Sequence, residues 1–517
     1  MKNNTPPQNT TDPSGRSALV GNVVTGWLSH LVTIITGFFV PRVMDEQLGS
    51  AMLGIWDLAW SFVVYFSLGK LGLATSLNRF VSKYRASGDI DKLQVAISTS
   101  TIIQVTTATI ITVIAGLIAY TLPRMNSNLN EHLVVAQYVI FILGVNVALR
   151  FLFETSRNVL NGCHRWDINN KIEAVVNILA SGSIIVSLLT GYGLIAASII
   201  YTLFTLLEGL IRSRFLRQVC PEAVWKFSLF SFSFASKLFR FGITVFMMGL
   251  APVIILNSTN ILIATTIGVH ALAIFARPNA LLRFIRTLVT RFTFTLTPMA
   301  GPILSKDGPD ELRRFLILCT RYGFAFSLPA ITLFCLYGGE VIWLWMGPDF
   351  VNEAIITILG IGALMPLSQS PMTRILIGLN LHGMIFMRAL FFGLAIFGVG
   401  LYILLSINAS MEEFAFLMSF SLSFMYGIIV PYYACRELEL PIRKYLADGF
   451  GRVGLLWAVA TVPLAVIHGH QLSSSFFSVL IEIVLYCSIL ATLYWIYLLP
   501  KQAKNIIRAK LLGASET

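Results

Sequence analysis

The sequence predicts an all-α polytopic membrane protein of about 14 transmembrane helices, arranged as two six-helix lobes related by a parallel repeat plus two C-terminal helices. Three observations support this fold class. Of the 517 residues, 56% are hydrophobic and 12% are charged, about half the charged fraction of a soluble domain. Apolar segments of membrane-spanning length recur along the whole chain. Three short motifs also recur at nearly the same separation, and no loop is long enough to fold as a catalytic domain.

The individual spans follow from length, because a helix needs about 20 mostly apolar residues to cross a bilayer. Fourteen segments meet this measure: Ala18–Val40, Met52–Ala74, Leu93–Leu122, Leu133–Phe153, Ile172–Thr190, Gly193–Ile211, Leu238–Thr265, Leu272–Ile303, Phe315–Tyr337, Ala354–Ile375, Met384–Ile407, Phe414–Tyr433, Val453–Ile467 and Phe476–Leu499. The thirteenth is short and contains Pro463. A count of twelve or thirteen therefore stays open, if this region enters the membrane without crossing it.

The charges of the loops predict that both termini and the Thr75–Lys92 loop are cytoplasmic, since Lys and Arg concentrate in cytoplasmic loops. With the N-terminus inside, only Arg42 and Arg124 fall clearly outside. In the first half of the chain the expected inner-loop cations are Arg79, Lys83, Arg85, Lys92, Arg157, Arg165, Lys171, Arg212, Arg214, Arg217, Lys226, Lys237 and Arg240. We attribute the net charge of +12 to such loops, and expect no nucleic-acid partner.

An internal repeat predicts the domain organisation. The motif Leu48–Trp56 matches Ile267–Phe275, Ser87–Leu93 resembles Asp307–Leu312, and Val159–Gly162 resembles Ile375–Gly378. Parallel repeats build two-lobed transporters with the substrate path between the lobes. We therefore expect a disordered cytoplasmic tail (1–17), an N-terminal six-helix lobe (18–212), a cytoplasmic linker (213–237), a C-terminal six-helix lobe (238–436), two accessory helices (437–500) and a cytoplasmic tail (501–517).

The segment Phe275–Thr297 is mostly apolar but carries four arginines, Arg277, Arg283, Arg286 and Arg291. On one helix these four fall within roughly a half-circle. A guanidinium in hydrocarbon costs about 2.5–3.5 kcal/mol on insertion scales, so four on a lipid-facing helix would scarcely insert. Arginine also matches phosphate in a bidentate way. We predict that this helix lines a wet cationic cavity for an anionic, phosphate-bearing substrate; the alternative is that the arginines reach a helix end or pair with acids on other helices.

Other polar residues inside the predicted spans are candidates for gating or coupling. Asn146, Arg150 and Glu154 recur at every fourth position, so they share one helix face, and an Arg150–Glu154 ion pair that tethers two helices is the first expectation. Lys70 either adds charge at the inner mouth of the cavity or extends its long stem to the interface. Asp57 is either an arginine partner, a cation or proton site, or an outer-surface residue.

Several motifs are missing from the sequence. There is no Gly-x-x-x-x-Gly-Lys-Ser/Thr phosphate loop, no metal-binding spacing and no nucleophile elbow. The six scattered cysteines form no Cys-x-x-Cys pair and are interpreted as core residues. We therefore expect no cofactor, no metal site and no enzymatic activity, and transport would draw on an ion gradient or on downstream removal of the product.

Several motifs resemble the multidrug/oligosaccharidyl-lipid/polysaccharide exporter superfamily. Pro41-Arg42 with Leu48-Gly49 and Leu53-Gly54 resembles its first external loop, and Leu71-Gly72-Leu73 with Asn78–Tyr84 resembles its first inner loop. Trp345-Met346-Gly347 with Phe350 resembles an outer loop of its second half. The resemblance covers roughly Ala18 to Leu446. It is greatest to the bacterial polysaccharide-biosynthesis branch, the Wzx-like lipid-linked oligosaccharide flippases.

This resemblance implies two six-helix lobes around an alternating-access cavity, with two accessory C-terminal helices, in a bacterial plasma (inner) membrane. The implied substrate is a polyprenyl-diphosphate-linked oligosaccharide, moved from the inner to the outer leaflet for surface polysaccharide biosynthesis. The implied partners are this glycan and membrane lipid, with association with a polysaccharide polymerase as a further option. The alternatives are a flippase of the peptidoglycan lipid precursor and a cation-coupled multidrug exporter, although the latter branch tends to offer cavity acids rather than arginines. A membrane polymerase or ligase is disfavoured, because the longest external connection, Gly338–Glu353, is short.

Overall fold

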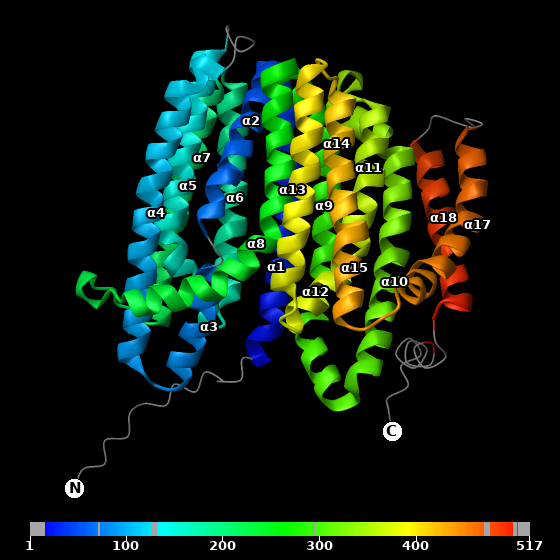
Figure 1. Cartoon of the computed structure of the whole chain (residues 1–517). Coiled ribbons are helices and arrows are strands. Elements are labelled where there is room, and N and C mark those ends of the chain that lie inside the picture. Colours follow the sequence, from blue (N-terminus) through cyan, green and yellow to red (C-terminus); the bar gives the residue numbers. More distant parts are fainter. Residues whose placement is uncertain are drawn as a thin grey trace. The chain divides into compact units, whose positions relative to one another are not determined.

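The computed structural model describes residues 16–70, 73–125, 132–293, 296–469, 476–499 and 504. Within these ranges the regular secondary structure is entirely helical (Figure 1). The described ranges exclude most of the predicted tails, 1–17 and 501–517, and within the helices a few side chains, including that of Arg291, are also not described. The all-α prediction is confirmed for the described residues.

Twelve of the described helices are long and apolar enough to cross a membrane. They begin with Val24–Leu48, end with Val479–Tyr497, and include twelve of the fourteen predicted spans. The predicted spans outside this set are the arginine segment and the thirteenth, which form α9 (Val269–Thr293) and α17 (Arg452–Gly469). In α9 the arginines lower the apolarity of an otherwise hydrophobic helix. A polytopic membrane protein is therefore confirmed.

The helices separate into two compact units, residues 1–276 and 277–517. Unit 1 contains α1 (Arg16–Leu48), α2 (Ser50–Ser67), the 3-10 segment η1 (Leu68–Lys70), α3 (Leu73–Ala86), α4 (Ile90–Met125), α5 (Leu133–Gly162), α6 (Trp166–Leu189), α7 (Leu194–Val219), η2 (Phe227–Leu229), α8 (Phe232–Leu262) and the π-helical η3 (Ile263–Ile267). In this unit α5 packs on α4 and α7, and α6 packs on α1 and α7. These packed helices position the polar side chains described below.

The prediction of a loop at Thr75–Lys92 is wrong for most of these residues, because Leu73–Ala86 forms helix α3. The reason is helical periodicity: Leu77 and Val81, four residues apart, are fully buried against Ile97 and Val159 of neighbouring helices. The predicted span Met52–Ala74 is divided correspondingly, since α2 ends at Ser67 and η1 follows. The chain turns at this point into an amphipathic helix rather than a loop.

The predicted cytoplasmic linker, 213–237, contains more helix than expected. Helix α7 continues to Val219, and α8 starts at Phe232. The Ser231 hydroxyl caps α8 by accepting a hydrogen bond from the backbone N–H of Phe234 at 3.2 Å. In Figure 1 the first part of α8 runs across the other helices of unit 1, and Phe234 and Leu238 bury their side chains there.

Unit 2 takes over within α9 and continues with α10 (Thr297–Met346), η5 (Pro348–Phe350), α11 (Glu353–Ser368), α12 (Ser370–Gly378), α13 (His382–Ser406), α14 (Met411–Phe424), η6 (Met425–Ile429), α15 (Val430–Glu437), α16 (Ile442–Leu446), η7 (Ala447–Gly451), α17 and α18 (Phe476–Tyr497). The predicted span Leu272–Ile303 is divided here, since α9 ends at Thr293 and α10 starts at Thr297. Gly308, at φ 85°, bends α10 near its start. The C-terminal helices pack on α10, where Tyr337 meets Ala460 and Tyr486.

The division between the units falls inside α9, between Ala276 and Arg277, whereas the sequence suggested a linker at 213–237. The difference arises because α8 packs on α2, α3 and α4, so it groups with unit 1 by contact. The division into six-helix lobes by repeat stays a prediction.

The glycines of the repeat motifs occupy equivalent positions in the fold. Gly49 and Gly268 directly precede α2 and α9 with φ of 82° and 136°, and Gly88 and Gly308 have φ of 69° and 85°. Glycine adopts such positive φ at little cost, which explains its recurrence. The first pair of motifs also touches, since Ser50 Oγ lies 2.6 Å from His270 Nδ1.

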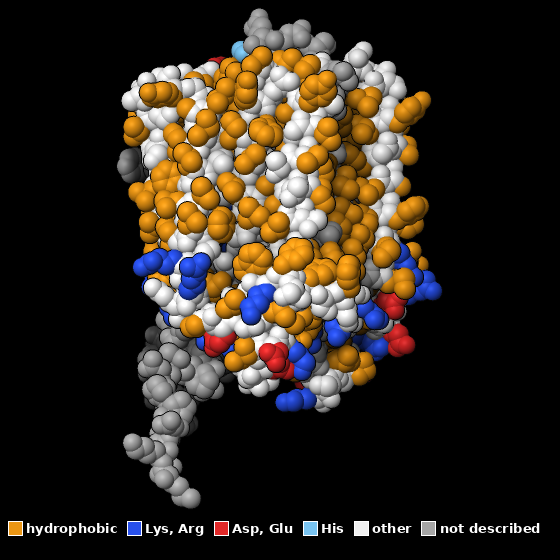
Figure 2. Space-filling view, turned by 90° about the vertical axis from the view of Figure 1, so that its left-hand side faces the viewer, with side chains coloured by type: hydrophobic (Ala, Val, Ile, Leu, Met, Phe, Trp, Pro, Cys, Tyr) orange, Lys and Arg blue, Asp and Glu red, His pale blue; other side chains and the backbone are white. Residues whose placement is uncertain are grey.

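The surface of the protein fits a membrane environment. On the face shown in Figure 2, hydrophobic side chains cover most of the height, whereas Lys, Arg, Asp and Glu gather at one end. Exposed apolar side chains such as Leu117, Leu203 and Val186 lie on the spans themselves. Hydrocarbon satisfies such side chains, because no water needs to be ordered around them.

Candidate substrate cavity and arginine helix

Unit 1 contains a polar cavity of about 280 Å³. Its walls come from α1, α2, η1, α5, α6 and α7. Four cations and three carboxylates line it: Lys70, Arg150, Arg157, Arg212, Glu154, Glu173 and Glu208. Charges inside membrane-spanning helices are expensive and usually face one another or a wet cavity, which makes this a candidate functional site.

The predicted Arg150–Glu154 ion pair is wrong. Glu154 instead pairs with Lys70 of η1, whose Nζ lies 3.5 Å from Glu154 Oε2. The spacing of four residues only placed the two charges on one face of α5, and the break after α2 brings Lys70 to the same place. Lys70 therefore lines the cavity and ties η1 to α5.

We expect Lys70→Ala to destabilise the protein by about 1–3 kcal/mol, because Glu154, with 11% of its side chain exposed, would lose its charged partner. Thermal unfolding of the purified protein in detergent measures this effect. Adding Glu154→Gln should restore most of the lost stability. We expect Lys70→Ala to retain most export and to matter less than loss of the α9 arginines, because a lysine stem can reach the interface. A double variant as unstable as Lys70→Ala would contradict the pairing.

Arg150 makes its contacts with neutral groups. Its Nε donates to Asn146 Oδ1 at 3.2 Å and its Nη2 donates to the Tyr201 hydroxyl at 2.6 Å. The guanidinium carbon lies 5.4 Å from the centre of the Tyr201 ring, within cation–π range. Asn146 in turn donates to Thr205 Oγ1 at 2.7 Å. This network joins α5 to α7 and holds the guanidinium in one orientation.

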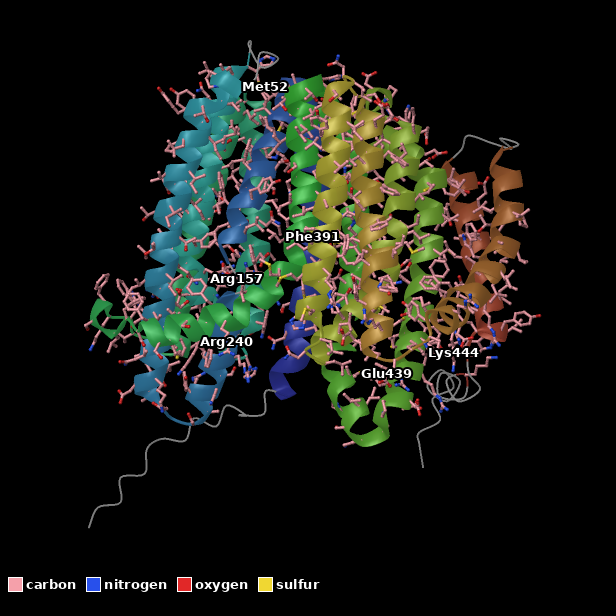
Figure 3. All side chains as sticks on the ribbon, viewed as in Figure 1. Met52, Arg157, Arg240, Phe391, Glu439 and Lys444 are labelled. Atoms are coloured by element: carbon pink, nitrogen blue, oxygen red, sulfur yellow. The ribbon has the colours of Figure 1, made fainter. Side chains whose placement is uncertain are left out.

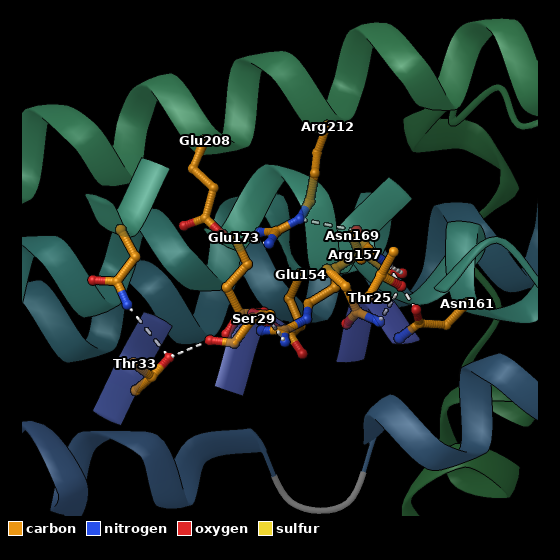
Figure 4. A network of polar contacts seen from close by, with 12 residues as sticks. Thr25, Ser29, Thr33, Glu154, Arg157, Asn161, Asn169, Glu173, Glu208 and Arg212 are labelled. Carbon is orange, nitrogen blue, oxygen red and sulfur yellow. Dashed lines mark hydrogen bonds and ion pairs between the residues drawn. The ribbon is translucent and has the colours of Figure 1, made fainter. Parts of the chain in front are cut away.

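Two further ion pairs line the cavity (Figure 4). Arg157 Nη2 is 3.1 Å from Glu173 Oε2, and Arg212 bonds both the Glu208 carboxylate and, at 3.0 Å, Asn169 Oδ1. Asn169 continues the network by donating to Asn161 Oδ1 at 2.7 Å. These bonds connect α5, α6 and α7.

Arg157 and Arg212 were expected in cytoplasmic loops, and this expectation is wrong. Both lie within helices, and only 7% of the Arg212 side chain is exposed; Figure 3 shows Arg157 on the helical part of unit 1. The predicted spans Leu133–Phe153 and Gly193–Ile211 ended before these two arginines, but both arginines are paired and the helices continue past them. Two signals pointed to them: Glu208 and Arg212 are four residues apart, and Arg157 and Asn161 extend the polar face of Asn146, Arg150 and Glu154. Glu173 carried the same signal, since Asn169, Glu173 and Asn177 recur at every fourth position.

Asp57 lies half-buried in α2 and is outside the set of residues that line this cavity. Its backbone carbonyl accepts a hydrogen bond from the Ser61 hydroxyl at 3.0 Å. Its proposed coupling role therefore stays a prediction.

The arginine helix α9 presents its cations in different surroundings. Arg277 is almost fully buried, at 2% exposure, and its guanidinium carbon lies 5.7 Å from the centre of the Trp345 ring. Arg283 is exposed and Arg286 is half-buried. The structure describes α9 as helical at Arg291 but does not describe that side chain.

Arg286 is the most unusual cation of this helix. Its Nε is buried and has no hydrogen-bond partner among the described residues, and Arg283 and Tyr426 are its electrostatic neighbours. No described carboxylate forms an ion pair with Arg286, so the expected alternative of acid pairing does not account for it. A buried donor without a partner is costly, so this nitrogen is available to bond a group that enters from outside the described residues.

Comparison with known proteins identifies a family whose sequences match this chain and solved structures that have a similar fold. The family of polysaccharide biosynthesis proteins matches residues 66–354, more than half of the chain. No curated protein matches the chain significantly.

Solved structures of transporters share the fold. The lipid II flippase MurJ, in an inward closed conformation, has a TM-score of 0.69 and 14% identity, covering 92% of this chain and 98% of its own. An inward-facing multidrug resistance MATE family transporter of the MOP superfamily has a TM-score of 0.63 and 13% identity, covering 82% and 99%. A MOP superfamily transporter from Pyrococcus furiosus, described as having a binding pocket of reverse polarity, has a TM-score of 0.54 and 12% identity, covering 83% and 96%. At these identities the likeness concerns the fold.

Proposed function

Because the chain belongs to the polysaccharide biosynthesis protein family and has the fold of MOP superfamily transporters, we propose that it is a flippase for a polyprenyl-diphosphate-linked oligosaccharide. It would move this lipid from the inner to the outer leaflet of a bacterial plasma membrane. The observation that carries the proposal is the arginine-bearing helix α9, with a buried guanidinium nitrogen of Arg286 that lacks a partner among the described residues.

A diphosphate suits these arginines. Each guanidinium offers a planar fork that bonds two phosphate oxygens, and such charge-assisted bonds are about twice as strong as neutral ones. Arg283 and Arg286 are three residues apart, nearly one helical turn, so both can reach one diphosphate. Arg277 and Arg291 would meet the head group at other depths, since they lie about 21 Å apart along the helix axis.

The family match favours an oligosaccharide over the peptidoglycan precursor carried by the lipid II flippase of the same fold. The cationic character of α9 disfavours a multidrug cation as substrate. The pocket of reverse polarity described for the Pyrococcus transporter supports the idea that pockets of this fold differ in charge. An ion gradient is the proposed energy source.

The test is transport by the purified protein in proteoliposomes that contain a fluorescently labelled polyprenyl-diphosphate oligosaccharide. Arrival at the opposite leaflet is measured by the fraction that a membrane-impermeant glycosidase cleaves. We expect transport to exceed that of protein-free vesicles and to exceed that of lipid II in matched vesicles. Equal or faster lipid II transport would favour the peptidoglycan alternative, and no transport of either lipid would contradict a flippase.

The orientation of the protein gives a separate prediction. Arg85 and Lys226 are exposed at positions that the loop charges place inside. Asp349 is also exposed, and it follows the ninth predicted span, Phe315–Tyr337, which ends outside when the arginine segment is counted as a crossing. In a Cys-free background, a membrane-impermeant maleimide applied to intact cells should label Asp349→Cys but miss Arg85→Cys and Lys226→Cys. Both of the latter should react after permeabilisation. Labelling of either one in intact cells would overturn the orientation.

A further inference from the structure

The charges of the unit 1 cavity do not balance. Three of its cations each contact a carboxylate: Lys70 with Glu154, Arg157 with Glu173, and Arg212 with Glu208. Arg150 is the fourth cation, and its contacts among the described residues are neutral ones, to Asn146 and Tyr201. The charged side chains that line the cavity therefore sum to one excess positive charge. Arg150 is the lining cation without a described carboxylate at ion-pair distance, although Glu208 and Glu173 are its electrostatic neighbours.

Arg150 lies deep within the predicted membrane region. It stands 17 residues after Leu133, where α5 starts, and 12 residues before Gly162, where α5 ends. The nearer end is thus about 18 Å away along the helix. The side chain is nevertheless exposed, because it faces the cavity. At this depth the charge of Arg150 lies away from bulk water and salt, so it is screened less than a surface charge. An anion would therefore be attracted more strongly here than at the surface.

The walls next to Arg150 are aromatic. The rings of Trp60 and Tyr201 meet edge to face with centroids 5.5 Å apart, and Phe153 and Phe204 also line the cavity. Flat apolar ring faces together with a few fixed polar groups form the usual lining of a small-molecule site. The three paired carboxylates still have free lone pairs that can accept hydrogen bonds from hydroxyls.

We propose that this cavity binds one sugar ring that bears a single carboxylate, a hexuronate residue of the transported glycan, with the carboxylate on Arg150 and the ring on the aromatic wall. Three features favour this ligand. One excess charge fits a monoanion, whereas a diphosphate needs more than one cation. A volume of about 280 Å³ fits one ring rather than a long chain. The carboxylate acceptors fit sugar hydroxyls. The inference rests on the proposed function in taking the ring to belong to the cargo.

Binding of soluble sugars to the full-length purified protein tests this inference without requiring transport. Isothermal titration calorimetry measures the affinities of glucuronate, glucose and inorganic phosphate. Glucuronate has both a negative charge and a sugar ring, glucose has only the ring, and phosphate has only the charge. We expect glucuronate to bind about tenfold or more tightly than glucose, because one charge-assisted contact is added. Glucuronate should also bind more tightly than phosphate, which offers charge but no ring face.

Arg150→Gln should remove the preference for glucuronate over glucose, and Arg150→Lys should retain part of it, since it keeps the charge but loses the fork. The matched control is Arg165→Gln, which removes an arginine of unit 1 that pairs with Asp167 and does not line the cavity. That variant should bind glucuronate as the unmodified protein does. The glucuronate–glucose comparison on the unmodified protein needs no variant to fold.

Equal affinity for glucuronate and glucose, or for glucuronate and phosphate, would overturn the inference. Retention of the full preference by Arg150→Gln would also overturn it. Failure of transport with intact glucuronate binding would instead contradict the proposed flippase function and leave the site in place. The two proposals therefore fail separately.

Discussion

Replacement of Arg283, Arg286 and Arg291 together by alanine is expected to abolish export of the lipid-linked glycan while the protein remains inserted in the membrane. Each charge-assisted phosphate contact contributes roughly 1.5–3 kcal/mol, so each loss should slow transport about tenfold or more. The helix itself should persist, because alanine is the best helix former and no described carboxylate pairs with Arg286. Accumulated precursor in the inner leaflet and surface polysaccharide in cells measure the effect, at equal protein level.

The single variants refine this expectation. Arg286→Ala should be severely defective, since its buried Nε lacks a partner that the substrate would supply. The Arg→Lys variants should be intermediate, because lysine keeps the charge but loses the planar fork. The control is Arg314→Ala, which removes an exposed arginine of unit 2 that pairs with Glu311, and it should export normally.

A purely structural role for these arginines predicts a different pattern. The triple variant would then be scarce in the membrane, and neutralising a partner acid would rescue its level. Normal export by the triple alanine variant would rule out the substrate-binding role.

Replacement of Arg212 by methionine is expected to cause the largest loss of stability. Arg212 is 7% exposed, it bonds the Glu208 carboxylate and Asn169 Oδ1, and Glu208 is itself only 15% exposed. Removal of one member of a buried ion pair costs about 3–5 kcal/mol, because the remaining charge stays buried without compensation. The loss is measured as a lower unfolding temperature in detergent and a lower level of monodisperse protein.

A second substitution separates this cause from simple loss of packing. Arg212→Met with Glu208→Gln should recover most of the stability, because no uncompensated charge remains. The matched control is Arg157→Met, whose pair with Glu173 is more than a third exposed on both sides and is expected to contribute less than about 1 kcal/mol. An Arg212→Met protein that unfolds at the same temperature as the unmodified one would contradict the role given to this pair.

The membrane class, most of the spans, the arginine helix and the glycines of the repeat could all be predicted from the amino-acid sequence. The physical reason is that these features are local. In a bilayer each backbone polar group must be satisfied within its own helix, so a long apolar segment is helical whatever surrounds it. The glycines of the repeat are local features too. Positive φ is a property of a single residue and favours glycine, and it occurs at Gly49, Gly88, Gly268 and Gly308.

The pairing of the charges could not be predicted, because it depends on which helices pack together. The spacing of Arg150 and Glu154 placed them on one face of α5, but the partner of Glu154 comes from η1 and that of Arg150 comes from α7. Arg157 and Arg212 resembled loop cations until helix packing brought Glu173 and Asn169 to them. The contacts of a side chain depend on which helices are neighbours, and apolar periodicity carries little information on that order, because lipid and protein satisfy apolar faces almost equally well.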